Sequence, residues 1–134
     1  MKDADELCRG LLRKARSDRV AMEASLSAQA LDAACFHAQQ MAEKSLKTFL
    51  AHQSVAFPYT HNLTKLIELA ARIDQTFRSL LPAVSPLTPY AVELRYDDSF
   101  WPRQEVAAEA RASALAVLSF VLDRLPPHIR NAAG

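Results

Sequence analysis

Apolar residues recur at helical spacing along most of this chain. The clearest pattern runs from Ser27 or Ala28 to His52, where small or apolar side chains return every three or four residues. Its members are Leu31, Ala34, Cys35, Ala38, Met41, Ala42, Ser45, Leu46 and Phe49. A period of about 3.6 residues predicts an amphipathic α-helix that turns one face to a core.

Four further helices are predicted. They cover residues 3 or 5 to 24, 61 to 81, 89 to 95 and 103 to 125. Asp3 or Asp5 is expected to cap the first helix, and Thr60 or Asn62 the third. The oxygens of such side chains accept hydrogen bonds from the unpaired backbone N–H groups of the first helical turn. The three prolines within residues 82–89 predict a connection rather than a core element. Prolines also stop the last helix, so the tail 126–134 is expected to be loose.

Long helices joined by short loops pack as antiparallel bundles. We therefore expect a single all-α domain over residues 1–134, an up-and-down antiparallel bundle of about five helices with its core between about residues 3 and 125. The second and fifth helices are the most apolar and should lie centrally. A chain of 134 residues buries enough surface to fold without a metal or disulfide.

Composition and charge narrow the function classes. The formal net charge is +1, which gives no overall attraction to nucleic acid or anionic membranes. No apolar run approaches the ~20 residues that span a bilayer, and the acidic N-terminus does not resemble a signal peptide. Cys8 and Cys35 lie on apolar stripes and are expected to be small buried side chains in a reducing compartment. A cytoplasmic protein with no membrane partner is therefore predicted.

No complete catalytic motif is present. The histidines at 37, 52, 61 and 128 are scattered and no CxxC or HExxH occurs, so neither a metal site nor a cofactor is expected. The only glycines are Gly10 and Gly134, which excludes a glycine-rich phosphate loop. The dispersed carboxylates offer no obvious acid–base pair.

Polar side chains also form a stripe on the second helix. His37, Gln40, Lys44 and Lys47 fall within a sector of about 80° opposite the apolar face. An ordinary solvated face is the usual explanation of such a stripe. Two amines, an amide and an imidazole in line would also offer several donors to an anion. Asp18 falls on the apolar stripe of the first helix, where it is either paired or marks a frayed, wet turn.

Two further clusters allow more than one interpretation. The first helix carries the basic residues Arg9, Arg13, Lys14, Arg16 and Arg19, which could track phosphates, although a solvated helical face is favoured. Trp101, with Phe100 and Tyr96 nearby, could form a stacking platform. We favour a role for Trp101 either as a plug at the end of the bundle or in an interface, because Trp and Tyr are enriched at such places.

Residues 35–47, CFHAQQMAEKSLK, resemble the signature helix of HEPN domains, which carries a string like FHAQQAAEKALKA. Three shorter segments follow the order of the same family. Residues 15–18 resemble the family's A-x-x-D, residues 60–63 (THNL) resemble its T-H-D-L, and residues 91–96 resemble its A-x-x-x-R-Y. The resemblance spans about residues 10 to 125 and implies a structural role for Asp18.

Membership would imply a five-helix bundle that commonly dimerises, in prokaryotic defence, stress or toxin–antitoxin systems, often beside a minimal nucleotidyltransferase. Many HEPN proteins are metal-independent ribonucleases whose motif is an Arg followed after four to six residues by a His. Arg95 corresponds to that Arg, but residues 100–102 are Phe, Trp and Pro. The resembling subgroup with an RYP segment usually lacks the His too, and here Asp97 replaces the Pro.

Three hypotheses result. The leading one is a non-catalytic HEPN protein that binds a nucleotide or RNA and acts with a minimal nucleotidyltransferase. Its expected phosphate contacts are His37, Gln40, Lys44, Lys47 and Arg95. The second is a homodimeric interaction module without a ligand. Its structural and interface residues would be Asp18, Glu43, Lys44, His61, Arg95, Tyr96 and Trp101. The third is a metal-independent ribonuclease that uses His37 or His61 as a base.

Overall fold

The computed structural model describes residues 3–91 and 96–131. Within them lie six α-helices and two 3-10 helices, and the all-α prediction is confirmed. The elements are α1 (Ala4–Ser27), α2 (Leu31–His52), α3 (Leu63–Ala71), the 3-10 helix η1 (Gln75–Leu80), α4 (Leu81–Val84), the 3-10 helix η2 (Thr88–Tyr90), α5 (Gln104–Leu122) and α6 (Pro127–Arg130). Arg95, a predicted phosphate contact, lies outside the described residues.

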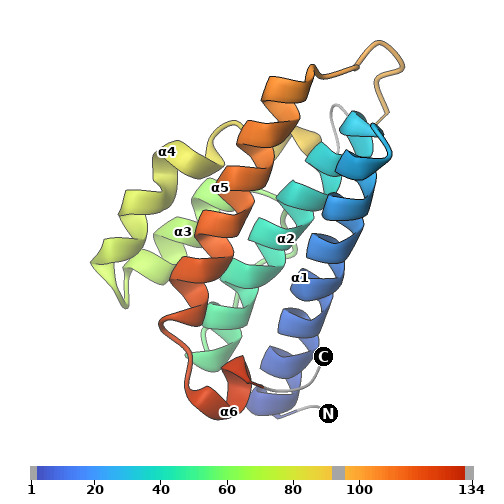
Figure 1. Cartoon of the computed structure of the whole chain (residues 1–134). Helices are drawn as coiled ribbons and strands as arrows, with labels where there is room; N and C mark the ends of the chain where they lie inside the picture. The colour runs from blue at the N-terminus through green and yellow to red at the C-terminus, as the bar shows by residue number, and fades with distance from the viewer. Residues whose placement is uncertain (1–2, 92–95, 132–134) are drawn as a thin grey trace.

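The first two helices form an antiparallel pair (Figure 1). Asp3 caps α1 as predicted, because its side chain accepts the N–H of Glu6 at 2.7 Å. The helix runs on to Ser27, three residues past the expected end at Ala24. The chain turns at Gln29, whose φ of 62° cannot continue a right-handed helix. For this reason α2 begins at Leu31 and not at Ser27 or Ala28.

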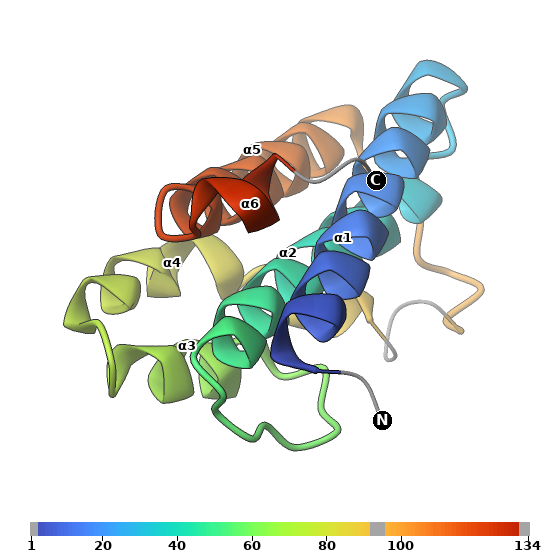
Figure 2. The ribbon, with the colours of Figure 1, turned by 90° about the horizontal axis from the view of Figure 1, so that it is seen from below.

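The core is built around α2. This helix contacts α1, α3 and α5, and Figure 2 shows it between α1 and α3. Met41 and Leu46 on its apolar face are 0 % exposed. Cys8 of α1 and Cys35 of α2 are free and fully buried, as expected. Burial raises the pKa of each thiol to about 11, so both behave as small apolar side chains at neutral pH.

The prediction of one continuous helix over residues 61–81 is wrong. Asn62 caps α3 by accepting the N–H of Lys65, but α3 already ends at Ala71. Asp74 then leaves helical geometry, with φ −138° and ψ 102°, and accepts the N–H of Thr76 to start η1. An aspartate side chain that accepts a hydrogen bond from a nearby backbone N–H stabilises a turn at the expense of the helix. The spacing of apolar residues carries no information about such a bond.

The proline-rich stretch is not a simple connection. Residues 82–89 belong largely to α4 and η2, and Val84 and Leu87 are 0 % exposed within the core. Pro82 stands in the first turn of α4, where its missing N–H breaks no helical hydrogen bond. The helix expected at 89–95 is replaced at its start by η2, and residues 92–95 lie outside the described part.

The C-terminal segment also differs from the prediction. The last long helix, α5, ends at Leu122 rather than 125, and the tail expected to be loose forms α6 over residues 127–130. Ile129 is 0 % exposed, and Arg16 of α1 donates to the carbonyl oxygen of Arg130 at 2.6 Å. The buried Ile129, this hydrogen bond and the contact of His128 with Asp5 at 3.2 Å hold α6 against the bundle. No helix of the described residues is long and apolar enough to cross a membrane.

Candidate functional site

Asp18 joins α1 to α2 through both of its carboxylate oxygens. Its Oδ1 lies 2.9 Å from Nδ1 of His37, and its Oδ2 accepts from Nζ of Lys44 at 2.7 Å. His37 and Lys44 are seven residues apart, about two helical turns, and therefore project from the same side of α2. Asp18 is only 8 % exposed, and α1 continues past it without a break. The carboxylate on the apolar stripe is thus paired, not wet.

A second buried carboxylate, Glu43 of α2, organises another polar cluster. Its Oε2 accepts from Lys47 at 3.0 Å, and its Oε1 lies 2.8 Å from Nδ1 of His61. Gln39, which is 0 % exposed, donates to Glu43 Oε1 and to the His61 carbonyl oxygen. Gln40 in turn donates to Gln39 at 2.7 Å. This cluster ties α2 to the segment that precedes α3.

The predicted polar row on α2 is therefore divided between two partners. His37 and Lys44 turn to Asp18, whereas Gln40 and Lys47 belong to the cluster around Glu43. Lys47 is 9 % exposed, so the expectation of a solvated face is wrong there. Its ammonium also lies 5.8 Å from the ring centre of Phe57 and 5.9 Å from that of Tyr59. Glu43 and these two aromatic rings enclose the amine, and their contacts replace the hydration that it loses on burial.

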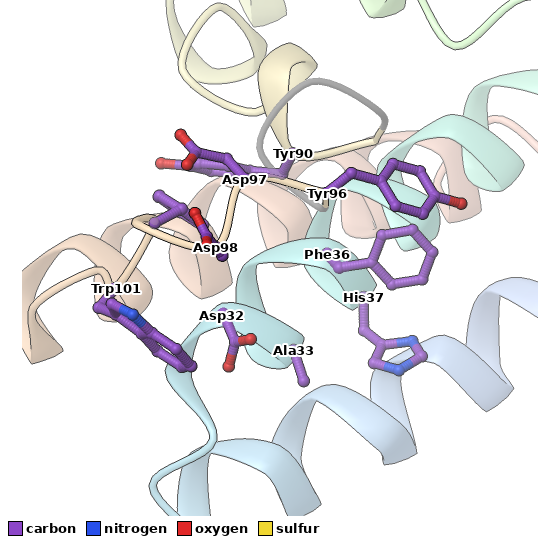
Figure 3. A pocket seen from close by; sticks show the side chains of 10 residues that line it. Asp32, Ala33, Phe36, His37, Tyr90, Tyr96, Asp97, Asp98 and Trp101 are labelled. Carbon is purple, nitrogen blue, oxygen red and sulfur yellow. The ribbon is translucent and has the colours of Figure 1, made fainter.

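A pocket of about 610 Å³ opens beside the first half of α2. Ten described residues line it: Asp32, Ala33, Phe36, His37, Tyr90, Tyr96, Asp97, Asp98, Phe100 and Trp101. Figure 3 labels all of them except Phe100. This volume is in the range of small-molecule sites. The wall opposite α2 comes from η2 and the segment that leads to α5.

Aromatic rings dominate the pocket. Tyr90 and Phe100 stack with their centres 5.6 Å apart and their planes at 27°. Tyr96 lies beside Phe36 in Figure 3, and Phe36 contacts His37 edge-on at 5.2 Å. Trp101 is 72 % exposed, so the predicted plug at the end of the bundle is wrong, and the alternative role at an interface stays a prediction. Partial burial raises the pKa of the Tyr90 hydroxyl, which therefore stays protonated at neutral pH.

Carboxylates supply most of the charge in the pocket. Asp97 accepts from the N–H and the hydroxyl of Ser99 at 2.9 and 2.6 Å, and these bonds lower its pKa. Asp32 and Asp98 have no hydrogen-bond partner among the described residues. No Lys or Arg of the described part of the chain lines the pocket. The described lining is therefore acidic, with His37 at one edge.

His37 connects the pocket to the α1–α2 contact. A carboxylate oxygen only accepts hydrogen bonds, so Nδ1 of His37 donates to Asp18. That donation fixes the ring and leaves Nε2 as the nitrogen able to meet a ligand or a proton. The structure thus brings together three of the predicted site residues in the pocket, His37, Tyr96 and Trp101. Lys44 is linked to His37 through their shared partner Asp18.

Several residues of the pocket were not singled out from the sequence, among them Asp32, Phe36, Tyr90 and Asp98. They line one pocket because the segment after η2 lies against α2 in the fold. One usable signal existed, since four aromatic residues fall between positions 90 and 101. Among the residues that the structure describes, no group of three or more His, Cys, Asp or Glu side chains could hold a metal ion.

A family model identifies the family of this chain, and a solved structure shares its fold. The family model described as the HEPN domain matches residues 8–125 of the chain. The crystal structure of ST0689, an archaeal HEPN homologue, superposes with a TM-score of 0.68 at 21 % identity. That alignment covers 92 % of this chain and 98 % of the archaeal one, and at such low identity it establishes the fold alone. The comparison with curated proteins found no match.

Proposed function

Because this chain belongs to the HEPN domain family, we propose that it is a non-catalytic HEPN protein that binds a nucleotide or RNA and acts with a minimal nucleotidyltransferase partner. The setting we propose is a prokaryotic defence, toxin–antitoxin or stress system. The observation that carries the binding proposal is the aromatic pocket beside α2, with His37 at its edge.

A nucleobase suits the aromatic part of this pocket. Trp101 and Tyr96 are 72 % and 79 % exposed, so a planar ligand reaches their faces without unfolding any element. Stacking of one base on an aromatic side chain contributes about 1–3 kcal/mol. Burial of large exposed aromatic surface by a ligand is also favourable in its own right. The base would therefore occupy the space between the segment after η2 and α2.

The phosphate of the same ligand would lie outside the acidic pocket, toward α1. Nε2 of His37 remains available because Nδ1 bonds to Asp18. Lys44 uses one N–H on Asp18, and an ammonium has two more to offer. Its side chain is 25 % exposed, unlike that of Lys47 at 11 %. We therefore retain His37 and Lys44 as phosphate contacts and leave Gln40 and Lys47 with structural roles.

The binding test uses Trp101, which is the only tryptophan in the chain. Titration with nucleoside monophosphates and with short single-stranded RNA should change its fluorescence in a saturable way. His37→Ala should weaken binding, whereas the matched control His52→Ala, at the far end of α2, should bind as the wild type does. No saturable change with any nucleotide or RNA up to millimolar concentration would refute the binding proposal.

The nucleotidyltransferase partner is supported by family membership alone. It is tested by co-expression with the product of an adjacent reading frame, followed by affinity purification of the untagged protein. Recovery of an equimolar complex supports the partnership. Clean separation of the two proteins at low ionic strength, or an adjacent frame of another class, argues against it.

Ribonuclease activity is a second candidate because of one observation. The carboxylate of Asp18 bonds to Nδ1 of His37, whose side chain lines the pocket, and an acid that orients an imidazole in this way is the arrangement of a general base. Nε2 would remove the proton of an RNA 2′-hydroxyl, and the resulting oxygen would attack the adjacent phosphorus. The bond from that phosphorus to the 5′-oxygen of the next nucleotide would break, and the departing 5′-oxygen would take a proton from water or from the protonated His37. Incubation with RNA in excess chelator should yield 2′,3′-cyclic phosphate ends that His37→Ala abolishes. RNA that stays intact ends this candidate.

A homodimer is proposed as the assembled state, and Tyr96 and Trp101 offer exposed aromatic surface for it. Static light scattering of the wild type and of Trp101→Ala distinguishes the pocket from an interface. A dimer that dissociates in the variant assigns Trp101 to the interface. A dimer that persists leaves Trp101 to the pocket.

A further inference from the structure

We propose that the pocket selects guanine, whose Watson–Crick edge would donate hydrogen bonds to the carboxylates of Asp32 and Asp98. This inference rests on the proposed function, because it names which base the pocket takes. The guanine could belong to a free nucleotide or to an unpaired residue in RNA, and the chemistry recognised is the same.

Charge decides which end of a nucleotide enters. Asp32, Asp97 and Asp98 line the pocket, and among the described lining residues only His37 can carry a positive charge. Like charges at contact distance repel, also at these partly and fully exposed positions, where the solvent weakens the repulsion. A phosphate inside would therefore meet three acids, whereas a neutral base would meet acceptors and aromatic faces. The base enters, and the phosphate stays at the His37 edge.

The hydrogen-bonding capacity of the acids decides which base is preferred. A carboxylate only accepts, and it is best satisfied by two adjacent donors in bidentate geometry. Guanine presents such a pair, N1–H and N2–H₂, side by side on one edge. Adenine and cytosine present one amino group next to an acceptor nitrogen. Uracil presents one N–H between two carbonyl oxygens, whose lone pairs would face the carboxylate.

The three acids are not equally available. Ser99 already donates twice to Asp97, which lowers the pKa of that carboxyl and occupies one of its oxygens. Asp32 and Asp98 have no partner among the described residues. Asp32 on α2 and Asp98 on the segment before α5 both line the pocket together with Trp101, as Figure 3 shows. A purine stacked on Trp101 would place its edge next to these two acids.

The position of Asp32 is well defined by the fold. It stands in the first turn of α2, one residue after the helix begins at Leu31, so its backbone is fixed by the bundle. A carboxylate there is also favoured by the helix dipole. Asp98 comes from the segment between η2 and α5, on the opposite wall. The two acids therefore approach a ligand from two independent elements, which suits recognition of a flat edge.

The experiment compares GMP, IMP, AMP, CMP and UMP in titrations of the full chain, by Trp101 fluorescence and by calorimetry. GMP should bind about tenfold or more tightly than the others, as for one bidentate contact to a base. IMP, which lacks the 2-amino group, should fall between GMP and AMP. Short RNAs of uridine with and without one guanosine form the second arm, and a preference seen only there assigns the guanine to RNA.

Variants separate recognition from stacking. Asp32→Asn combined with Asp98→Asn should remove the preference for GMP while AMP binding stays near the wild-type value. Circular dichroism verifies that this variant is folded, and Asp123→Asn, at the exposed end of α5, is the matched control.

Each outcome has a separate meaning. Equal affinity for all five nucleotides overturns the guanine inference and leaves the proposed function intact. Absence of binding to any nucleotide and any RNA overturns both. Tighter binding of spermidine than of GMP, with competition between them, overturns the inference in favour of an organic-cation site, which aromatic and acidic walls also suit. A GMP preference that survives the double substitution rules out Asp32 and Asp98 as its source.

Discussion

Asp18 and His37 are 19 residues apart in the sequence, and their Oδ1 and Nδ1 atoms are 2.9 Å apart in the fold. The contact holds α1 against α2 and also sets the direction of a ring that borders the pocket. Lys44 bonds to the second oxygen of the same carboxylate. A buried acid is tolerated only when such partners replace its hydration, so packing and site geometry depend on one side chain.

Asp18→Ala should destabilise the protein by about 2–4 kcal/mol, because it leaves His37 and Lys44 without their buried partner. Urea unfolding followed by circular dichroism measures this change. The control is Glu68→Gln, whose partner Arg78 lies 3.4 Å away in a largely exposed pair. That substitution should cost less than about 1 kcal/mol. Equal losses in the two variants would contradict the structural importance of Asp18.

Glu43 and Lys47 should be energetically coupled. Lys47→Met and Glu43→Gln each leave one buried group with fewer partners, whereas the double variant removes both ends of the ion pair. We expect a coupling free energy of about 1–3 kcal/mol in the double-mutant cycle. If Lys47 were instead a solvated residue kept for an anion, Lys47→Met would change stability by no more than about 0.5 kcal/mol.

Leu87→Ala tests the core role of the proline-rich segment. Leu87 is 0 % exposed, so truncation should cost about 2–5 kcal/mol through lost burial and a residual cavity. Val20→Ala, at a position of α1 that is 71 % exposed, should stay within about 0.5 kcal/mol of the wild type. Thermal or urea unfolding gives both values. A small effect at Leu87 would mean that this segment does not complete the core.

Asp74 should contribute to acid sensitivity. Its hydrogen bonds from the side chain and the N–H of Thr76, and then from Arg124, hold its pKa below the usual 3.8. A carboxyl with a lowered folded-state pKa stabilises the protein fully above its unfolded pKa. That contribution is lost as the pH falls through the folded value. Melting temperatures measured on either side of pH 4 should therefore fall less steeply with acid in Asp74→Asn than in the wild type. Parallel curves would contradict this role.

The local pattern was sufficient for the three long helices and for the N-terminal caps of α1 and α3. The apolar period predicted α1, α2 and α5 to within about three residues at each end, and Asp3 and Asn62 cap where expected. These features depend on neighbours within one or two turns, which the sequence lists in order. The string of residues 35–47 also led to the correct family.

Other features depended on which surfaces meet. A helical wheel predicts that Lys47 is solvated, yet Glu43 and the ring of Phe57, which follows α2, enclose it. Leu87 and Ile129 lie beside prolines, and only docking against the bundle makes them core residues. The pocket joins residues 32–37 to residues 90–101, two stretches that no local pattern connects.

Hydrophobic periodicity and capping are short-range properties, so the order of residues was enough to predict an all-α chain, and the string of residues 35–47 pointed to the HEPN family. The pairing of Asp18 with His37 and Lys44, and the acidic lining of the described part of the pocket, follow from the three-dimensional arrangement. The environment of a charged side chain is set by groups that the fold brings near it in space. Local periodicity predicts which face of a helix is buried, but it does not specify the partner that faces it.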